Sequence, residues 1–305
     1  MRRALVIRGG AIGDFIVTLP AIKLLRDSIE NCVVEVLGYP GIADLAVAAG
    51  LAESSRSLEH RSMALLFVPG AKLDEALCEW LLSFNLIVSY LYDPDGIVRK
   101  NMERIGVKTY LDAPHRVVEG QGYAAQQLAK PLESLAMYLE DPAPSLQLPG
   151  AELNRRLLAV HPGSGSIKKN WPVQHWGRVL NELRGQRIVI ITGEAERERG
   201  VLGEIQAACP GLEFENWDSL PLVELARRLP ACSAFLGHDS GVSHLAAACG
   251  VPCHLFFGPT DPATWAPAND VVEVHRAPTR NLADLGWQEG WRTIRAFVCD
   301  KHALC

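Results

Sequence analysis

Three glycine-rich stretches carry the polar side chains with which this sequence could do chemistry. The first, GAIGDF (10–15), holds one carboxylate, Asp14, next to Gly13. The second, HPGSGSIKKNWP (161–172), combines hydroxyls with a lysine pair, and the third, GHDSGVSH (237–244), combines a carboxylate, hydroxyls and imidazoles. Each stretch follows an apolar run typical of a strand and precedes a run typical of a helix. Such strand-to-helix junctions present residues to the ligand crevice of α/β proteins.

The first stretch places a carboxylate on a loop that its glycines allow to approach a ligand closely. These glycines stand at positions 9, 10 and 13 and lack the GxGxxG spacing, so a dinucleotide-binding fingerprint is not supported. Asp14 could serve a ligand, or it could cap the helix that follows. From this stretch alone, helix capping is the favoured interpretation.

The second stretch could cradle a phosphate. Ser164, Gly165 and Ser166 offer hydroxyls and backbone amides to an anion, and Lys169 with its neighbour Lys168 adds positive charge. The P-loop pattern, with its Gly-Lys pair before Ser or Thr, is absent. A solvated turn with surface lysines explains the same residues equally well.

The third stretch opens a helix at Asp239 or Ser240, both natural N-caps, and Gly241 lets a ligand approach the helix end. The unpaired amides and the dipole at that end favour a diphosphate. A carboxylate at Asp239 would repel a diphosphate unless it accepts ligand hydroxyls or holds the amides in place. His244 could reach the ligand, although a structural role between helix and sheet is slightly favoured.

Two further junctions are weaker candidates. In TGEAERE (192–198), Glu194 or Glu196 could accept hydrogen bonds from ribose hydroxyls, but acidic residues are also common in a first helical turn. In FFGPTDPATWAP (256–267), Trp265 could stack on a base or close the domain surface.

Alternating strand-like and helix-like runs must position these junctions. Strands are expected at 4–8, 32–38, 64–68, 86–90 and 107–111, and again at 157–162, 187–193, 212–216, 234–239, 253–258 and 271–275. Helices are expected at 119–140, with a kink at Pro131, and at 172–184, 194–209, 220–229 and 241–249. This alternation predicts an α/β protein with mostly parallel sheets covered by helices on both faces.

The chain is expected to form two doubly wound domains, because 305 residues exceed the size at which one core usually stops growing. DPAPSLQLPGAELN (141–154), with three prolines and a glycine, is the best linker. We therefore expect an N-terminal Rossmann-like domain over residues 1–150 and a C-terminal one over 151–305, whose last helix could pack back on the first. A cleft between them is the default ligand site.

Composition excludes several classes of protein. The net charge is −5, and residues 1–150 sum to −4, so nucleic-acid binding is not supported. The first apolar run is too short for a signal peptide, and no segment approaches about 18 uninterrupted apolar residues, so a cytoplasmic protein is expected. The eight cysteines show neither a CxxC pair nor a zinc-site spacing, which favours reduced thiols and no metal.

The three stretches, in this order, resemble glycosyltransferase family 9, the ADP-heptose:lipopolysaccharide heptosyltransferases. The likeness is carried by GAIGDFIVTLPAIKLLR (10–26), HPGSGSIKKNWPVQHW (161–176) and HDSGVSHLAAACGVPCHLFFGPTDPATWAP (238–267). The resemblance implies a GT-B fold in which the second domain mainly holds the nucleotide-sugar and the first the acceptor. It also implies metal-independent, inverting transfer with Asp14 as general base.

On this basis we expect ADP-heptose as the donor, no cofactor, and a lipopolysaccharide core or a related, lipid-linked glycan as the acceptor. A lipid-linked acceptor would bring the protein to the inner leaflet of the membrane, and a local cluster such as Arg99, Lys100 and Arg104 could attract its anionic groups. The residues expected to bind the donor are Gly13, Ser164, Gly165, Ser166, Lys169, Glu196, Asp239, Ser240, Gly241 and His244.

Rival functions stay open. A GT-B glycosyltransferase that uses a UDP- or GDP-sugar would keep both fold and mechanism, and a GT-B sugar-nucleotide epimerase would keep the fold but need no acceptor. A non-catalytic nucleotide-sugar-binding protein would keep only the donor site. A Rossmann dehydrogenase is disfavoured because the glycine spacing is missing.

Overall fold

The computed structural model describes residues 2–149 and 157–301, which form two α/β units. The first unit comprises Met1–Val118 and Ala124–Pro142, and the second comprises Glu119–Tyr123 and Ala143–Cys305. The chain therefore passes between the units three times. The boundary predicted between residues 150 and 151 lies outside the described residues.

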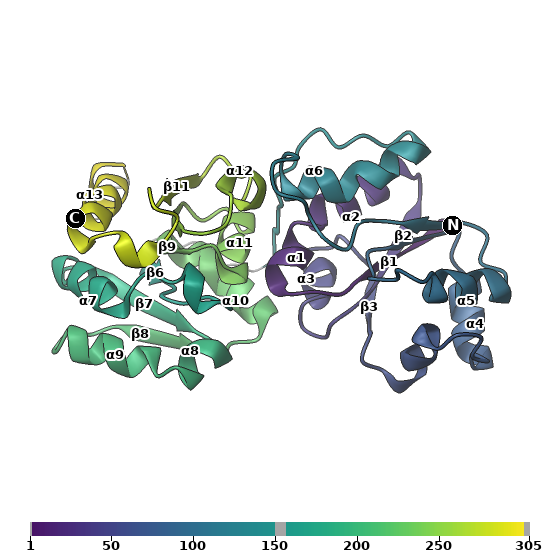
Figure 1. Ribbon diagram of the computed structural model, residues 1–305, viewed down its shortest axis with the longest axis horizontal. Helices are drawn as coiled ribbons and strands as arrows, with labels where there is room; N and C mark the ends of the chain where they lie inside the picture. The colour runs from purple at the N-terminus through teal and green to yellow at the C-terminus, as the bar shows by residue number, and fades with distance from the viewer. Residues whose placement is uncertain (1, 150–156, 302–305) are drawn as a thin grey trace. The chain divides into compact units, whose positions relative to one another are not determined.

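The first unit is built on a parallel sheet with the strand order β3-β2-β1-β4-β5. Its strands are β1 (Arg2–Arg8), β2 (Cys32–Gly38), β3 (Ser54–Ser57), β4 (Leu86–Ser89) and β5 (Tyr110–Asp112). Its helices are α1 (Ile12–Ile16), α2 (Leu19–Ser28), α3 (Asp44–Ala48), η1 (Arg61–Phe67), α4 (Glu75–Leu82), α5 (Ile97–Ile105), α6 (Ala124–Ala129) and η2 (Lys130–Leu135). Helices α2 and α6 cover one face, and α4 and α5 cover the other (Figure 1).

The apolar runs of β1 and β4 are buried on both sides, as central strands of a parallel sheet require. Leu5 and Ile7 of β1 pack with Leu81 and Met102 in the core on one face. Thr18 precedes α2, and Pro20 occupies its first turn, where the missing N–H has no helical acceptor to lose. The loop 9–11 and α1 connect β1 to α2.

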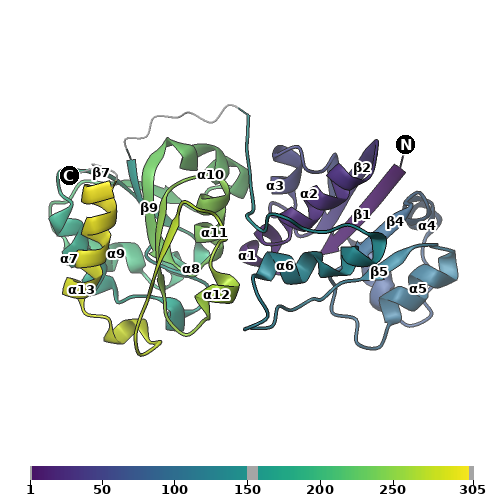
Figure 2. The ribbon, with the colours of Figure 1, turned by 90° about the horizontal axis from the view of Figure 1, so that it is seen from above.

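The second unit is built on a six-stranded parallel sheet with the order β11-β10-β9-β6-β7-β8. Its strands are β6 (Leu157–Val160), β7 (Arg187–Thr192), β8 (Glu215–Asp218), β9 (Cys232–His238), β10 (Cys253–Phe257) and β11 (Val272–Arg276). Its helices are η3 (Ile167–Lys169), α7 (Val173–Glu182), α8 (Glu194–Glu198), α9 (Val201–Ala208), α10 (Leu222–Arg228), η4 (Leu229–Ala231), α11 (Gly241–Ala248), α12 (Pro262–Trp265), η5 (Leu282–Asp284), α13 (Trp287–Arg295) and the π-helical turn η6 (Ala296–Lys301). Helices α7, α9 and α13 cover one face, and α10 and α11 cover the other (Figure 2). The last helix, α13, packs on α7.

The strand predicted at 64–68 is wrong. Residues 64–67 belong to the 3₁₀-helix η1, in which Met63 and Leu66 are buried while Leu65 and Phe67 are exposed, a period of three rather than two. The third strand is instead β3, a polar SSRS segment that the sequence analysis missed. It is a short edge strand that pairs through its backbone with β2, so it needs no apolar side chains.

The long helix predicted at 119–140 is also wrong. The segment holds only α6 and η2, because Gly120 and Gly122 adopt positive φ angles of 83° and 86° and Ala136 ends η2 at a φ of 58°. Pro131 lies in the first turn of η2 rather than at a kink. The helix predicted at 194–209 is likewise split, since Gly200 separates α8 from α9 with a φ of 68°.

The expectation that all cysteines are reduced thiols is wrong at one position. Cys32, Cys78, Cys209, Cys232, Cys249 and Cys253 are free. Cys299, however, is disulfide-bonded. Neither a CxxC pair nor a zinc-site spacing indicates this disulfide in the sequence.

Candidate active site

The candidate loops follow strands at the points where the strand order of each sheet reverses. In the second sheet this switch point lies between β6 and β9, so the loop after β6 (161–166) and residues 239–240 after β9 emerge side by side. In the first sheet it lies between β1 and β4, and the loop that carries Asp14 follows β1. Ligands of doubly wound proteins bind at such points. The fold thus brings together the second and third of the predicted stretches.

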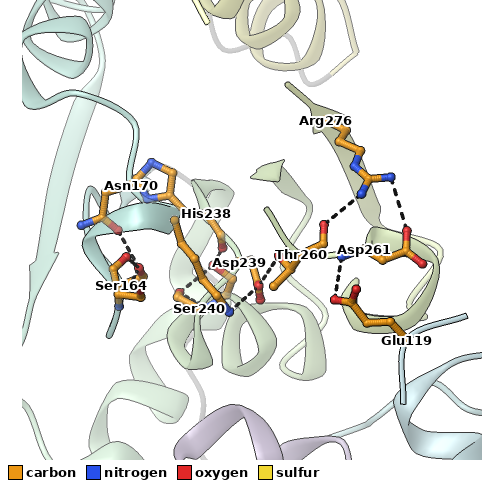
Figure 3. Close-up of polar contacts among 12 residues, drawn as sticks. Glu119, Ser164, Asn170, His238, Asp239, Ser240, Thr260, Asp261 and Arg276 are labelled. Carbon is orange, nitrogen blue, oxygen red and sulfur yellow. Dashed lines mark hydrogen bonds and ion pairs between the residues drawn. The ribbon is translucent and has the colours of Figure 1, made fainter. Parts of the chain in front are cut away.

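Lys169 and Asp239 form an ion pair at the second switch point. Lys169 Nζ donates to Asp239 Oδ2 at 2.6 Å, and the same oxygen accepts from Thr260 Oγ1 at 2.7 Å (Figure 3). The Asp239 side chain is only 7% exposed, so its charge needs these two donors. Sequence reasoning missed Thr260, which reaches the site from the loop after β10.

The structure settles which residue caps α11. The Ser240 hydroxyl accepts from the backbone N–H of Ser243 at 3.2 Å, and Asp239 makes no capping bond. Gly241 is the first residue of the helix, so the first amides of α11 have no acceptor within the helix itself. His244 is buried on this helix, 4% exposed.

The loop 161–166 is organised by its own hydrogen bonds. The buried Ser164 hydroxyl bonds to Asn170 Oδ1 at 2.6 Å and to the carbonyl of Ser166 at 2.8 Å. Arg199, which sequence reasoning missed, donates to the carbonyls of Ser164 and Gly165 at 2.9 and 3.4 Å. The Ser164 hydroxyl therefore shapes the loop, and Lys169 is the residue of this stretch that meets Asp239.

Glu196 is buried beside this loop, whereas Glu194 is exposed. Glu196 Oε2 accepts from the Gly193 backbone N–H at 3.0 Å, which is the capping arrangement of α8. A Cβ at Gly163 would lie 2.1 Å from Glu196 Oε1, so only glycine allows the loop to pass so close to the carboxylate. Contact of either glutamate with ribose remains a prediction.

Two buried histidines hold the site in place. His238 Nε2 accepts from the Trp171 backbone N–H at 2.9 Å and from the indole of Trp176 at 3.3 Å, so its proton is on Nδ1, 3.4 Å from the Gly163 carbonyl. Burial lowers the pKa of His238 to about 3, which keeps the ring neutral. Burial also lowers the pKa of His161, whose Nδ1 donates to the Ile191 carbonyl at 3.0 Å.

Asp14 lies in the first unit, in α1, one residue after Gly13. Its Oδ2 accepts from the Ala11 backbone N–H at 3.0 Å, and its Oδ1 lies 3.8 Å from Arg8 Nη2. The Arg8 side chain is 2% exposed and also donates to the backbone carbonyls of Asp14 and His115. Burial lowers the pKa of Arg8. The Asp14 carboxylate is 37% exposed, so it caps α1 and still faces solvent.

In the basic cluster proposed from the sequence, one residue of three, Arg99, forms ion pairs. Arg99 bonds to Asp112 at 2.7 Å and to Glu103 at 3.5 Å, and Lys100 bonds to the Asp95 carbonyl at 3.0 Å. Arg104 donates to the Ala71 carbonyl. The carboxylates neutralise Arg99, whereas Lys100 and Arg104 keep their charge and are held in place by backbone carbonyls.

Within residues 2–149 and 157–301, no three histidine, cysteine or acidic side chains are grouped so that they could hold a metal ion. The absence of a metal from the mechanism stays a prediction. Every helix in the described part of the chain is too short or too polar to cross a membrane.

Two α/β units, each built on a doubly wound parallel sheet, are typical of the GT-B fold, and solved structures confirm it. The chain superposes on the Escherichia coli ADP-heptose heptosyltransferase II with a TM-score of 0.78 at 17% identity, covering 99% of both chains. It superposes on the Escherichia coli heptosyltransferase WaaC with ADP with a TM-score of 0.72 at 20% identity, covering 99% and 100% of the two chains. At these identities the likeness shows the fold.

The family model of glycosyltransferase family 9 (heptosyltransferase) matches residues 98–290, and the chain belongs to this family. Lipopolysaccharide heptosyltransferase 1 of Pseudomonas aeruginosa is 34% identical over 155 residues, or 48% of this chain and 41% of that protein. The chain thus matches less than half of that relative's length. Asp14 lies outside the residues that the family model matches.

Proposed function

We propose that this protein is an inverting glycosyltransferase that moves heptose from ADP-heptose to a lipopolysaccharide core or a related glycan. The second unit holds the nucleoside diphosphate, and the first unit presents Asp14 to the acceptor. A cytoplasmic location with peripheral contact to the inner membrane leaflet is part of the same proposal.

The ion pair of Lys169 with the nearly buried Asp239, beside the N-terminus of α11, is the observation that carries this proposal. An ammonium group and helix amides at a switch point form a site for a diphosphate. Asp239 Oδ2 is occupied by Lys169 and Thr260, which leaves the other carboxylate oxygen to accept ligand hydroxyls. The names of the relatives, which include lipopolysaccharide heptosyltransferases, support heptose as the sugar.

In the proposed reaction, Asp14 accepts the proton of the acceptor hydroxyl while that oxygen attacks the anomeric carbon of the sugar. The bond between the anomeric carbon and the diphosphate oxygen breaks, and ADP leaves with the electron pair. Lys169 and the first amides of α11 stabilise the negative charge that develops on the leaving group. The mechanism assigns no step to a metal ion.

The first test is the thermal stability of the protein with ADP, UDP and GDP in turn. A ligand at about 100 times its Kd adds about 2.7 kcal/mol to the free energy of unfolding, enough for a shift of several degrees. We expect ADP alone to give this shift. A selective response to UDP or GDP would overturn ADP-heptose as the donor but keep the fold and mechanism, and no response to any of the three would favour a protein without this donor site.

A further inference from the structure

A short segment from the first half of the sequence is bound to residues 260–264 of the second unit, which are called the donor loop here. This segment, residues 119–123, is called the strap here; it lies between two stretches of the first unit. Glu119 Oε1 accepts from the Asp261 backbone N–H at 3.1 Å, and the Gly120 N–H donates to Thr264 Oγ1 at 3.1 Å. The strap therefore holds the start of α12, where Asp261 is the N-cap residue.

Arg276, the last residue of β11, also binds this loop, at Asp261 and Thr260. Its Nη1 lies 3.4 Å from Asp261 Oδ1, and its Nη2 donates to the Thr260 carbonyl at 3.5 Å. Both side chains are partly buried, 29% exposed for Arg276 and 26% for Asp261. Figure 3 shows Glu119, Asp261 and Arg276 on one side of Thr260, and Asp239 on the other.

Thr260 connects this framework to the ion pair. Its backbone carbonyl is bound by Arg276, and its hydroxyl donates to Asp239 Oδ2, the oxygen that also receives Lys169. A shift of Thr260 would remove one of the two donors to a nearly buried carboxylate. The carboxylate would then depend on Lys169 as its one remaining side-chain donor, so Lys169 would be less free to bind a ligand.

We propose that Arg276 and the strap are positioning elements of the donor site: they fix Thr260, which orients Asp239 and leaves Lys169 available to a nucleoside diphosphate. This inference rests on the proposed function, because it concerns the same donor site. Neither Arg276 nor Glu119 is assigned a contact with the ligand. Their effect on donor binding passes through the Thr260 hydroxyl.

The test is a set of ADP affinities measured by isothermal titration calorimetry on the full chain. We expect Arg276→Ala and Thr260→Val each to raise the Kd about tenfold, the cost of about one hydrogen bond to a charged group. The double variant should bind only about as weakly as Thr260→Val alone, because both changes remove the same interaction. Arg276→Lys, which keeps the charge, should recover part of the affinity.

Arg187→Ala is the matched control. Arg187 begins β7, which pairs with the edge strand β8 on the other side of the same sheet, and it pairs with Glu215 at 3.1 Å, so its loss should leave the Kd unchanged. Glu119→Gln retains a carbonyl acceptor for the Asp261 N–H and should bind like wild type, whereas Glu119→Ala should bind more weakly. Because Glu119 is exposed, we expect both of its variants to fold. They therefore test the strap even if Arg276→Ala fails to fold.

The outcomes separate the two proposals. If wild type binds ADP and the Arg276 and Glu119 variants bind it as tightly as Arg187→Ala does, the positioning role is overturned and the donor site stands. The positioning role is also overturned if the changes in ADP-binding free energy caused by Arg276→Ala and Thr260→Val add up in the double variant. If wild type binds none of ADP, UDP and GDP, the proposed function falls and this inference falls with it.

Discussion

One carboxylate oxygen of Asp14 accepts from the backbone N–H of Ala11, the N-cap residue of α1. The other lies beside the buried guanidinium of Arg8. The capping role that the sequence favoured is therefore present, and the exposed fraction of the side chain leaves room for a second role. The two roles make different demands on the side chain. A cap needs one acceptor oxygen, whereas a general base needs a group that can take up a proton.

Asp14→Asn separates these demands, because asparagine keeps an acceptor for the Ala11 N–H but cannot act as a base. We expect turnover to fall by about 10² to 10⁴, while the ADP affinity stays near wild type. Steady-state kinetics with an acceptor and calorimetry with ADP measure the two effects. Asp14→Ala is the comparison that should also lose about 0.5 to 2 kcal/mol of stability with the cap. Near-normal turnover in Asp14→Asn would exclude Asp14 as the base.

His238 predicts how stability depends on pH. Its pKa in the folded protein, about 3, lies below the ordinary value of 6.5, so the unfolded chain binds more protons between these values. The stability that His238 contributes is thus complete above pH 6.5 and is lost as the pH falls toward 3. Between pH 7.5 and 5.5 this loss is about 1.4 kcal/mol.

Urea unfolding of wild type and His238→Gln at these two pH values checks the prediction. The variant should be less stable at both, but its stability should fall by about 1.4 kcal/mol less than that of wild type. His161, whose pKa is also lowered, contributes in the same direction in both proteins. An equal fall in the two proteins would show that His238 does not carry this dependence.

At the scale of elements, α7 packs on α9 at Gly177, and no larger residue fits. A Cβ at this position would lie 2.3 Å from the Cβ of Ala208. We expect Gly177→Ala to destabilise the protein by about 1 to 3 kcal/mol, because separating the two helices outweighs the gain in helix propensity. Chemical denaturation measures the change.

Gly203 provides the control within the partner helix. It lies inside α9, is exposed, and would have no atom within 4 Å of an added Cβ. Gly203→Ala should therefore stabilise the protein by about 0.5 to 1 kcal/mol. If Gly177→Ala and Gly203→Ala change the free energy of unfolding by the same amount, the close contact between α7 and α9 does not determine the destabilisation.

Strands buried on both faces were predictable from the sequence, and so was the edge strand β11, whereas the edge strand β3 was not. The strands β1, β2 and β7 can be recognised by their apolar runs, because helices cover both faces of a parallel sheet and keep water from its central strands. The polar edge strand β3 has no such signal, and the apolar residues of η1 gave a false one. In 119–140, the positive φ angles of Gly120 and Gly122 override a run of good helix formers.

At the scale of the whole molecule, the sequence predicted which loops lie at the switch point of the second sheet but not what supports them. Junctions after strands carry ligand residues in any doubly wound sheet, so Lys169, Asp239 and Ser240 could be singled out by position. Arg8 and Arg199 could not be singled out, because each donates to backbone carbonyls that come within reach only in the folded chain. His238 was hidden for a similar reason, as a strand residue whose partners lie about 60 to 75 positions away in the chain.

The strap means that the second unit is not one continuous piece of the gene. A fragment that starts at Ala143 would encode the whole six-stranded sheet and yet lack Glu119 and Gly120, two of the groups that hold the start of α12. Recombination between relatives at the linker would pair the donor loop of one parent with the strap of another. Chimaeras built to test the proposed donor site should therefore exchange residues 119–123 and 260–264 together, because hydrogen bonds join the two segments.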